Sequence, residues 1–357
     1  MPINETYRTW IQRICELRPK QRKTQVQNFV WLLVGIFHSH SVSLSKVAGK
    51  VISQAKNVST VRRLSRFLAS SAVDVRSWYR STAKAWLVSQ FQQIGEIRLI
   101  VDGTKVGFGH QLLIVSLAYR HRAVPIAWSW VHHVRGHSTA AKQICLLKYV
   151  RSLIPQEMSV FLVGDSEFGS MAVLQQLQQW HWFFVLRQKG NLGLWLNERT
   201  GWQRLDSLVQ CAGQSAWYAN GYLTQSDIFP VSVLVYWQKG EKEPWCLATN
   251  LPDASSTLRY YRRRMWIEEM FADFKKHGFD LESTMLRNPP RLSRLTLAVV
   301  FLYVWLLSSG SRAVRSGLRH LVDRKDRRDL SLFQIGLRLM ERFLLHAQTF
   351  SLPLCSY

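Results

Sequence analysis

The sequence predicts an α/β protein, in which helices flank a mixed β-sheet. A β-rich segment is inserted between the strands of this sheet and the helix that follows them. Three observations predict this class. Apolar residues recur at helical spacing in residues 1–92, strand and helix patterns alternate in residues 93–190, and short strand patterns fill residues 191–252. Hydrophobic residues make up 47% of the 357-residue chain, which is enough for a large core and suits two or three domains.

Residues 1–92 are expected to form a helical domain. Helical units are predicted over residues 29–37, over residues 43–55, and from Ser59 or Thr60 to about residue 68, since either residue is a suitable N-cap. The two short units resemble a helix-turn-helix, and a plain helical bundle explains them equally well.

Residues 93–190 are expected to form the first part of the central sheet. Strands are predicted at residues 96–102, 111–118, 123–130, 159–165 and 182–186, and helices at residues 139–153 and 170–179. The order strand-strand-strand-helix-strand-helix-strand is that of a ribonuclease H-like core. In such a sheet the first and fourth strands are parallel neighbours, so Asp102 and Asp165, which end them, should converge.

The rest of the chain is divided into three parts. Residues 191–252 are expected to be a β-rich insertion, residues 253–310 the second part of the core, and residues 311–357 a basic helical segment. The second part of the core includes a 13-residue, mostly apolar run at residues 295–307, which is too short to cross a bilayer and predicts a buried helix.

The start of the chain and its cysteines predict a cytoplasmic protein without a membrane partner. The first 23 residues are polar and basic and lack the apolar stretch of a signal peptide. The five cysteines are scattered and form no CxxC pair, which fits a reduced compartment and gives no zinc-site spacing.

The charge balance predicts a polyanionic partner. Lysine and arginine number 47 against 23 acidic residues, a formal net charge of +24. Double-stranded DNA is the expected partner, and Arg62, Arg63 and Arg66 are expected to lie along its groove or backbone. The arginine-rich residues 312–328 either contact DNA too or form a solvated helix face.

One segment carries the strongest chemical pattern. Tyr261, Arg264, Glu268 and Lys275 are spaced at offsets 0, 3, 7 and 14, so on one helix their side chains fall within about 60° of arc. An acid, two cations and a phenol on one stripe suit a metal-dependent enzyme that acts on nucleic acid. An amphipathic helix with a solvated charged face is the alternative.

Asp102, Asp165 and Glu268 are therefore the predicted catalytic and metal-binding residues. Three converging carboxylates repel one another, and hard divalent cations relieve that repulsion, so two Mg²⁺ or Mn²⁺ ions are the expected cofactors. Such ions can drive in-line displacement at a phosphodiester. Glu167 is a possible substitute for Asp165.

Two other acids lie near Glu268. Glu269 is its obvious rival but points about 100° further round the helix. Asp273 faces elsewhere and is expected to be solvated.

The chain resembles the DDE transposases of bacterial insertion sequences that carry the "YREK" signature. The resemblance rests on Asp102 in Ile-Val-Asp-Gly-Thr, Asp165 in Val-Gly-Asp-Ser-Glu-Phe, and the spaced residues Tyr261, Arg264, Glu268 and Lys275. The β-rich insertion between Asp165 and Glu268 fits the same group, and the resemblance covers roughly residues 40–310.

The resemblance implies cut-and-paste transposition. Asp102, Asp165 and Glu268 would hold the metals, while Tyr261, Arg264 and Lys275 would bind phosphates near the cut end. Water would nick the transposon end, the freed 3′-hydroxyl would form a hairpin, and strand transfer would follow in a dimer on paired DNA ends.

Some aromatic and histidine side chains leave alternatives open. Trp245 could stack on an extruded base, although most of the 15 tryptophans must be core residues. A histidine cluster, His132, His133 and His137, lies beside Arg135. This cluster either binds a metal or forms a polar loop near DNA, and the loop is the favoured interpretation.

Two rival functions remain on the sequence alone. The first is a nuclease or domesticated relative without strand transfer. The second is a DNA-binding protein, such as a repressor, whose acids are vestigial.

Overall fold

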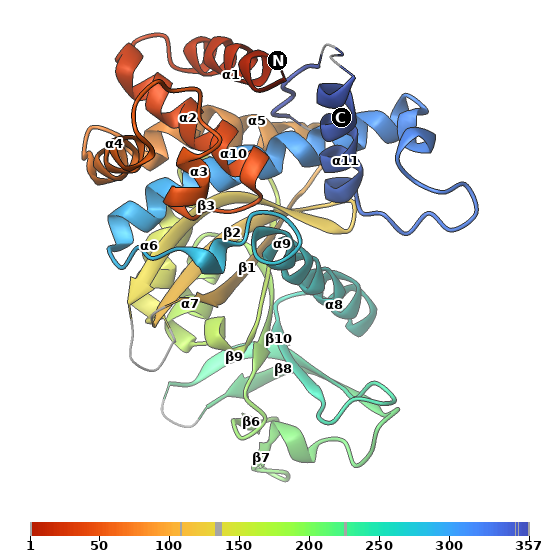
Figure 1. The fold of residues 1–357 in the computed structure, drawn as a ribbon. Helices are drawn as coiled ribbons and strands as arrows, with labels where there is room; N and C mark the ends of the chain where they lie inside the picture. The colour runs from red at the N-terminus through yellow and green to blue at the C-terminus, as the bar shows by residue number, and fades with distance from the viewer. Residues whose placement is uncertain are drawn as a thin grey trace.

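The computed structural model describes residues 2–107, 109–132, 138–224, 227–346, 348 and 350–355. Within this part of the chain the strands are β1 (Ile97–Val106), β2 (His110–Tyr119), β3 (Arg122–His132), β4 (Val160–Gly164), β5 (Phe183–Gln188), β6 (Gly193–Trp195), β7 (Trp202–Arg204), β8 (Ser215–Leu223), β9 (Phe229–Tyr236) and β10 (Trp245–Thr249). All of them join one sheet, in the order β3-β2-β1-β4-β5-β10-β9-β8-β6-β7 (Figure 1).

The helices of the described residues are α1 (Pro2–Leu17), α2 (Lys23–Ser39), α3 (Leu44–Ala48), α4 (Asn57–Ala69), α5 (Val75–Ile94), α6 (Ala140–Arg151), α7 (Met171–Gln179), α8 (Ala254–Tyr261), α9 (Trp266–Phe274), α10 (Pro289–Arg315) and α11 (Leu332–Leu345). Short 3₁₀ turns are η1 (Ser166–Phe168), η2 (Leu205–Ser207), η3 (Arg262–Met265), η4 (Leu281–Ser283) and η5 (Leu318–Leu321).

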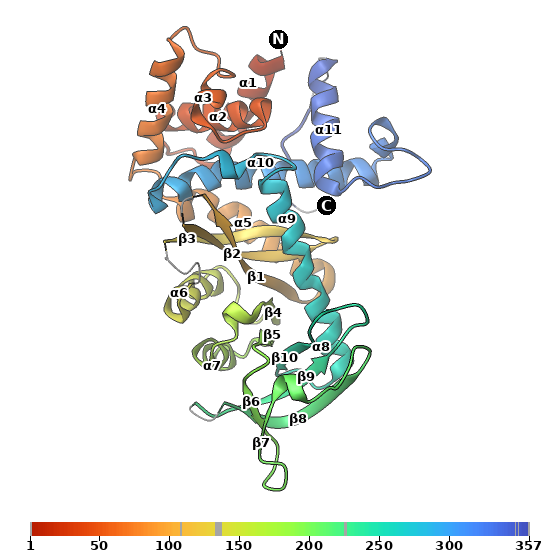
Figure 2. The same ribbon diagram turned by 60° about the horizontal axis from the view of Figure 1, so that its bottom comes forward.

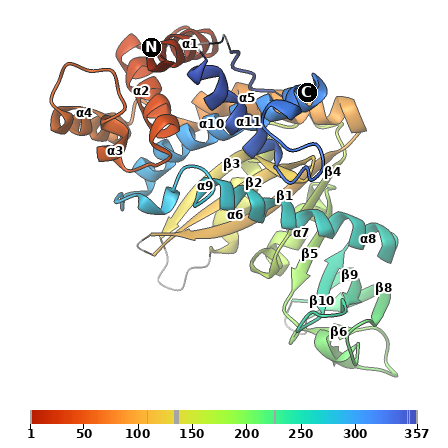
Figure 3. The same ribbon diagram turned by 45° about the vertical axis from the view of Figure 1, so that its right-hand side comes forward.

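The predicted α/β class and the ribonuclease H-like topology are confirmed. From β1 to β5 the elements follow the predicted order, β1 pairs antiparallel with β2, and β1 and β4 are parallel neighbours. The five β-strands of the inserted segment continue this sheet, because β10 pairs antiparallel with β5. They extend away from the N-terminal helices (Figure 3).

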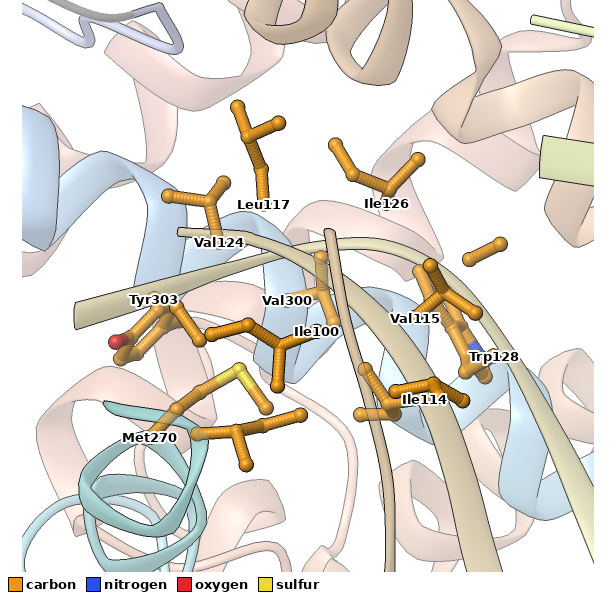
Figure 4. Close-up of a cluster of buried hydrophobic side chains, with 14 of the residues drawn as sticks. Ile100, Ile114, Val115, Leu117, Val124, Ile126, Trp128, Met270, Val300 and Tyr303 are labelled. Atoms are coloured by element: carbon orange, nitrogen blue, oxygen red, sulfur yellow. The ribbon is translucent and has the colours of Figure 1, made fainter. Parts of the chain in front are cut away.

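Helices cover both faces of the core strands, with α9 and α10 on one face and α6 and α7 on the other (Figure 2). For this reason every residue of β2 is buried. On the first face, Met270 of α9 packs with Ile100, Ile114, Val300 and Tyr303 in one apolar cluster (Figure 4). This packing fixes α9 against the sheet.

The buried helix is longer than the apolar run that predicted it. Helix α10 has 27 residues, which gives it the length and hydropathy to cross a membrane, yet 89% of its most apolar 18-residue window is buried inside the fold. It lies between the N-terminal helices and the sheet (Figure 1). Its apolar residues are therefore the core of this fold.

Some predicted boundaries are wrong. The unit at residues 43–55 is helical only over α3, and α4 begins at Asn57, so neither Ser59 nor Thr60 is its N-cap. Asp102 does not end its strand, because β1 continues to Val106 through its hairpin with β2.

Candidate active site

The sheet brings Asp102 and Asp165 side by side. The last parallel pair between β1 and β4 is Val101 with Gly164, and the two aspartates come directly after it. A side chain at Gly164 would place its Cβ 2.8 Å from Val101 Cγ1, so the glycine allows the two strands to approach here. Adjacent strands lie about 4.8 Å apart, which brings the two carboxylates within reach of one ligand.

Local hydrogen bonds hold each aspartate. One oxygen of Asp102 accepts from the backbone N–H of Gly103 at 2.7 Å, and one oxygen of Asp165 accepts from that of Ser166 at 2.7 Å. Each aspartate thus keeps its second oxygen, Oδ2, for another partner.

That partner is Arg264, which contacts all three predicted acids. Its Nη2 donates to Asp102 Oδ2 at 2.9 Å and lies 3.5 Å from Asp165 Oδ2. Its Nη1 donates to Glu268 Oε1 at 2.5 Å. The planar guanidinium thus gathers carboxylates from β1, the end of β4 and α9 around one positive charge.

Burial and charge act against each other at Asp102, which is 7% exposed. Burial raises the pKa of its carboxyl to about 6, while Arg264 and the Gly103 N–H oppose that rise, and the neighbouring Asp165 and Glu268 add to it. Burial also lowers the pKa of Arg264, but the three carboxylates outweigh it and the net shift is upward. The three carboxylates thus favour the charged form of Arg264.

The donor set suits a hard divalent cation. It consists of three carboxylates from three segments, and oxygen-only sets of this kind are what Mg²⁺ and Mn²⁺ prefer. In the described part of the chain, no three acidic, histidine or cysteine side chains already stand in the geometry of a metal centre. The carboxylates are arranged around the guanidinium instead, so a metal would require Arg264 to change partners.

The segment from Tyr261 to Lys275 is not the single helix that the spacing predicted. Helix α8 ends at Tyr261, the 3₁₀ turn η3 follows, and α9 ends before Lys275. The chain then folds back sharply, since a Cβ on Gly278 would lie 2.3 Å from the carbonyl oxygen of Asp273. Arg264 and Glu268 still lie on the same side, as expected, and form an i, i+4 ion pair.

The other two signature residues have different partners. Tyr261 is 3% exposed and its ring packs 5.2 Å from that of Trp245, so the insertion contacts the site here. Burial raises its pKa. Lys275 donates to the carbonyl oxygen of Lys105 at 3.0 Å and pairs with Glu282 at 3.0 Å.

The two rival acids are directed elsewhere. Glu167 accepts hydrogen bonds from Ser138 and Gln111. Glu269 pairs with Arg122 at 2.9 Å. Of the acids on α9, Glu268 is the one joined to Asp102 through Arg264.

The prediction that Asp273 is solvated is wrong. Its residue is 2% exposed, and burial raises the pKa of its carboxyl to about 7, against the attraction of Arg122. The Arg122 Nε lies 4.0 Å from Asp273 Oδ2. Arg122 begins β3 and belongs to no sequence motif, so it was not predicted, although it holds α9 to β3 through both Glu269 and Asp273.

The three N-terminal arginines differ in their surroundings. Arg62 and Arg66 are exposed on α4. Arg63 is half-buried: its Nε donates to Asn28 Oδ1 at 2.7 Å, and its guanidinium lies 4.1 Å from the ring centroid of Trp31. Arg63 therefore has an internal packing role.

The histidine cluster lies mostly outside the described residues, which include His132 but not His133, Arg135 or His137. The ring of His132 packs 5.0 Å from that of His110.

Comparison with known proteins shows the family of this fold and site. The transposase DDE domain matches residues 95–305, more than half of the chain. A search among curated proteins gave no match. Among solved structures, a cryo-EM structure of the piggyBac transposase synaptic complex with hairpin DNA aligns with 97% of this chain and 78% of that one, at 12% identity and a TM-score of 0.46. The matched residues 95–305 contain Asp102, Asp165 and Glu268, and the chain belongs to the transposase DDE domain family.

Proposed function

We propose that the protein moves an insertion sequence of the bacterial "YREK" group by cut-and-paste transposition, with Asp102, Asp165 and Glu268 as its catalytic carboxylates. The observation that carries this proposal is the convergence of those three acids, from three separate segments, on Arg264. A surface or vestigial role would not require them to meet.

The three carboxylates would hold two Mg²⁺ or Mn²⁺ ions. When bound, these ions would activate a water or a 3′-hydroxyl for in-line attack on a phosphodiester and stabilise the leaving oxygen. Arg264 would exchange its carboxylate partners for a bidentate contact with a DNA phosphate.

The remaining signature residues would orient the cut end. Lys275 would exchange Glu282 for a phosphate, since its ammonium acts as a mobile point charge. Tyr261 is buried, so it would act near the DNA through its packing on Trp245. This packing would place the half-buried indole of Trp245 beside the cut end. Trp245 would stack on an extruded base during hairpin formation.

The partners would be double-stranded transposon ends and target DNA, bound by a homodimer in the bacterial cytoplasm at the nucleoid. Arg62 and Arg66 on the exposed face of α4 would contact the DNA backbone or groove. The net charge of +24 supports a polyanionic partner such as DNA.

Cleavage of a DNA fragment that carries the element's own end tests this proposal. The wild type with Mg²⁺ or Mn²⁺ should nick the end and form a hairpin, whereas Glu268→Gln and Asp102→Asn should bind the end without cutting it. Glu269→Gln is the matched control, because that neighbouring acid pairs with Arg122 and should be dispensable for cleavage.

The other outcomes identify the rival functions. Cleavage without joining of pre-cut ends to target DNA would indicate a nuclease. Binding without cleavage by the wild type, with either metal, would indicate a DNA-binding regulator and overturn the proposed roles of the acids.

A further inference from the structure

Glu167 lies two residues after Asp165 and accepts hydrogen bonds on both carboxylate oxygens. Its Oε1 accepts from the backbone N–H and the hydroxyl of Ser138, at 2.7 and 2.5 Å. Its Oε2 accepts from the side-chain amide of Gln111 at 2.8 Å. The carboxylate thus joins η1, the segment before α6, and β2.

The hydrogen bond between Gln111 and Glu167 lies next to Gly103, the residue that follows Asp102. Gln111 is 3% exposed, and a Cβ on Gly103 would lie 2.3 Å from its Nε2. Side chains alternate along a strand, so Asp102 points to the α9 face while Gly103 leaves room for this amide on the α6 face. The absent side chain at Gly103 is what allows Gln111 to reach Glu167.

Gln143 of α6 closes the arrangement. This residue is 1% exposed, and its Nε2 donates to Ser138 Oγ at 2.9 Å and to the carbonyl oxygen of Glu167 at 3.0 Å. The backbone of η1, directly after Asp165, is therefore held from two sides.

We propose that Glu167 is a positioning residue, which sets the spacing between Asp102 and Asp165 by tying η1 to Gln111 beneath Gly103. The inference rests on the proposed metal-binding role of those two aspartates. Groups that orient metal ligands are worth about 10–100-fold in metal affinity. Glu167 would supply that effect without touching the metal or the DNA.

The donor and acceptor pattern provides a specific test. Replacing Glu167 by Ala removes both acceptors. Replacing Gln111 by Glu sets two carboxylates against each other where an amide donated at 2.8 Å. Combining Gln111→Glu with Glu167→Gln restores the hydrogen bond with its direction reversed, because the amide at position 167 now donates to the carboxylate at position 111. The amide oxygen at position 167 still accepts from Ser138.

The experiment is an electron paramagnetic resonance titration of the full chain with Mn²⁺ alone, with thermal unfolding recorded for each variant. Glu167→Ala and Gln111→Glu should each lower the Mn²⁺ affinity about 10-fold or more. The double variant should regain most of it. Glu157→Ala, an exposed acid before β4, should bind Mn²⁺ as the wild type does.

The Asp102→Asn variant distinguishes a failure of the positioning role from a failure of the proposed function. If it abolishes Mn²⁺ binding while Glu167→Ala leaves the affinity unchanged, or if the double variant is as weak as Gln111→Glu, the positioning role is wrong and the proposed function stands. If Asp102→Asn binds Mn²⁺ like the wild type, both fall. Should Glu167→Ala not fold, Gln111→Leu, which removes only the contact beneath Gly103, takes its place with the same expectation.

Discussion

At the scale of single residues, the site is organised by one guanidinium. Arg264 offers one positive charge to three carboxylates, and its fork of N–H donors reaches all of them. Without it, Asp102, Asp165 and Glu268 would repel one another in a partly buried place. A metal held by these carboxylates would therefore compete with Arg264 for the same oxygens.

This competition gives the first prediction, for Arg264→Gln. The variant should be less stable than the wild type without metal, and Mn²⁺ should raise its unfolding temperature by more, because the ion no longer has to displace a guanidinium. Differential scanning calorimetry with and without Mn²⁺ measures both effects. Arg263→Gln, next in the chain, is the control, and an equal Mn²⁺ shift in the wild type and Arg264→Gln would refute the competition.

The second prediction concerns Asp273, whose carboxyl has a pKa of about 7 because it is buried. Arg122, Glu269 and Tyr303 are the charged and titratable groups around it. Between its ordinary pKa and about 7 the folded state keeps a proton that the unfolded state has released. Stability from this group is therefore present at low pH and falls as the pH rises, by about 1.4 kcal/mol per pH unit in that window.

An Asp273→Asn variant cannot titrate at this position. Its free energy of unfolding, measured by urea denaturation, should approach that of the wild type near the ordinary aspartate pKa and exceed it increasingly towards neutral pH. A constant difference across that range would mean that Asp273 ionises normally.

Asp273 also shows why part of the site could not be predicted from the sequence. Helical spacing correctly separated it from Glu268, and the same spacing favoured Glu268 over Glu269. Whether a side chain on another side of the helix from Glu268 contacts solvent or protein depends on what packs against that side. Arg122 is the first residue of β3, about 150 residues earlier, and no local pattern reveals that contact.

At the scale of elements, strand patterns and helix periodicity predicted the core well. Alternation and apolar runs placed β1 to β5 and α6 and α7 in the correct order, because the strands are largely buried and each helix buries one stripe. The 3₁₀ stretch η3 within the Tyr261 segment was not predictable, since its residues have ordinary helix propensities. In this segment Tyr261 packs on Trp245 and Arg264 contacts the acids.

The third prediction concerns the crossing of α10 and α11. A Cβ on Gly336 would lie 1.9 Å from the carbonyl oxygen of Leu306, and one on Gly310 would lie 1.9 Å from that of Leu332. Gly336→Ala must push the helices apart and should cost about 1–3 kcal/mol of stability. Thermal unfolding checks this, with Gly49→Ala as control, because its Cβ would meet nothing closer than 3.5 Å.

At the scale of the whole molecule, the sheet is more continuous than its sequence suggests. The insertion was expected as a run of short strands without assigned partners, and β10 pairs with β5 and extends the core sheet outwards. That pairing joins residues about 60 apart, and strand patterns do not specify partners over such distances. The same pairing carries Trp245 to the site.

The fourth prediction follows from the net charge of +24, which makes the molecule a strong electrostatic partner for DNA. Affinity for any duplex should fall steeply with salt, by about 10³–10⁵ between 50 and 200 mM if six to ten phosphates are neutralised. Fluorescence anisotropy with a random duplex measures this slope. Asp102→Asn should leave it nearly unchanged, because binding and cleavage draw on different charges.

Substitutions on α4 locate part of that charge. Arg62→Ala and Arg66→Ala, on its exposed face, should each weaken binding and reduce the salt slope by about one. Arg63→Ala should instead lower the unfolding temperature and leave the slope unchanged, because its guanidinium is held by Asn28 and Trp31. If all three variants keep the wild-type slope, the basic face of α4 is merely solvated, and the DNA must lie along another surface.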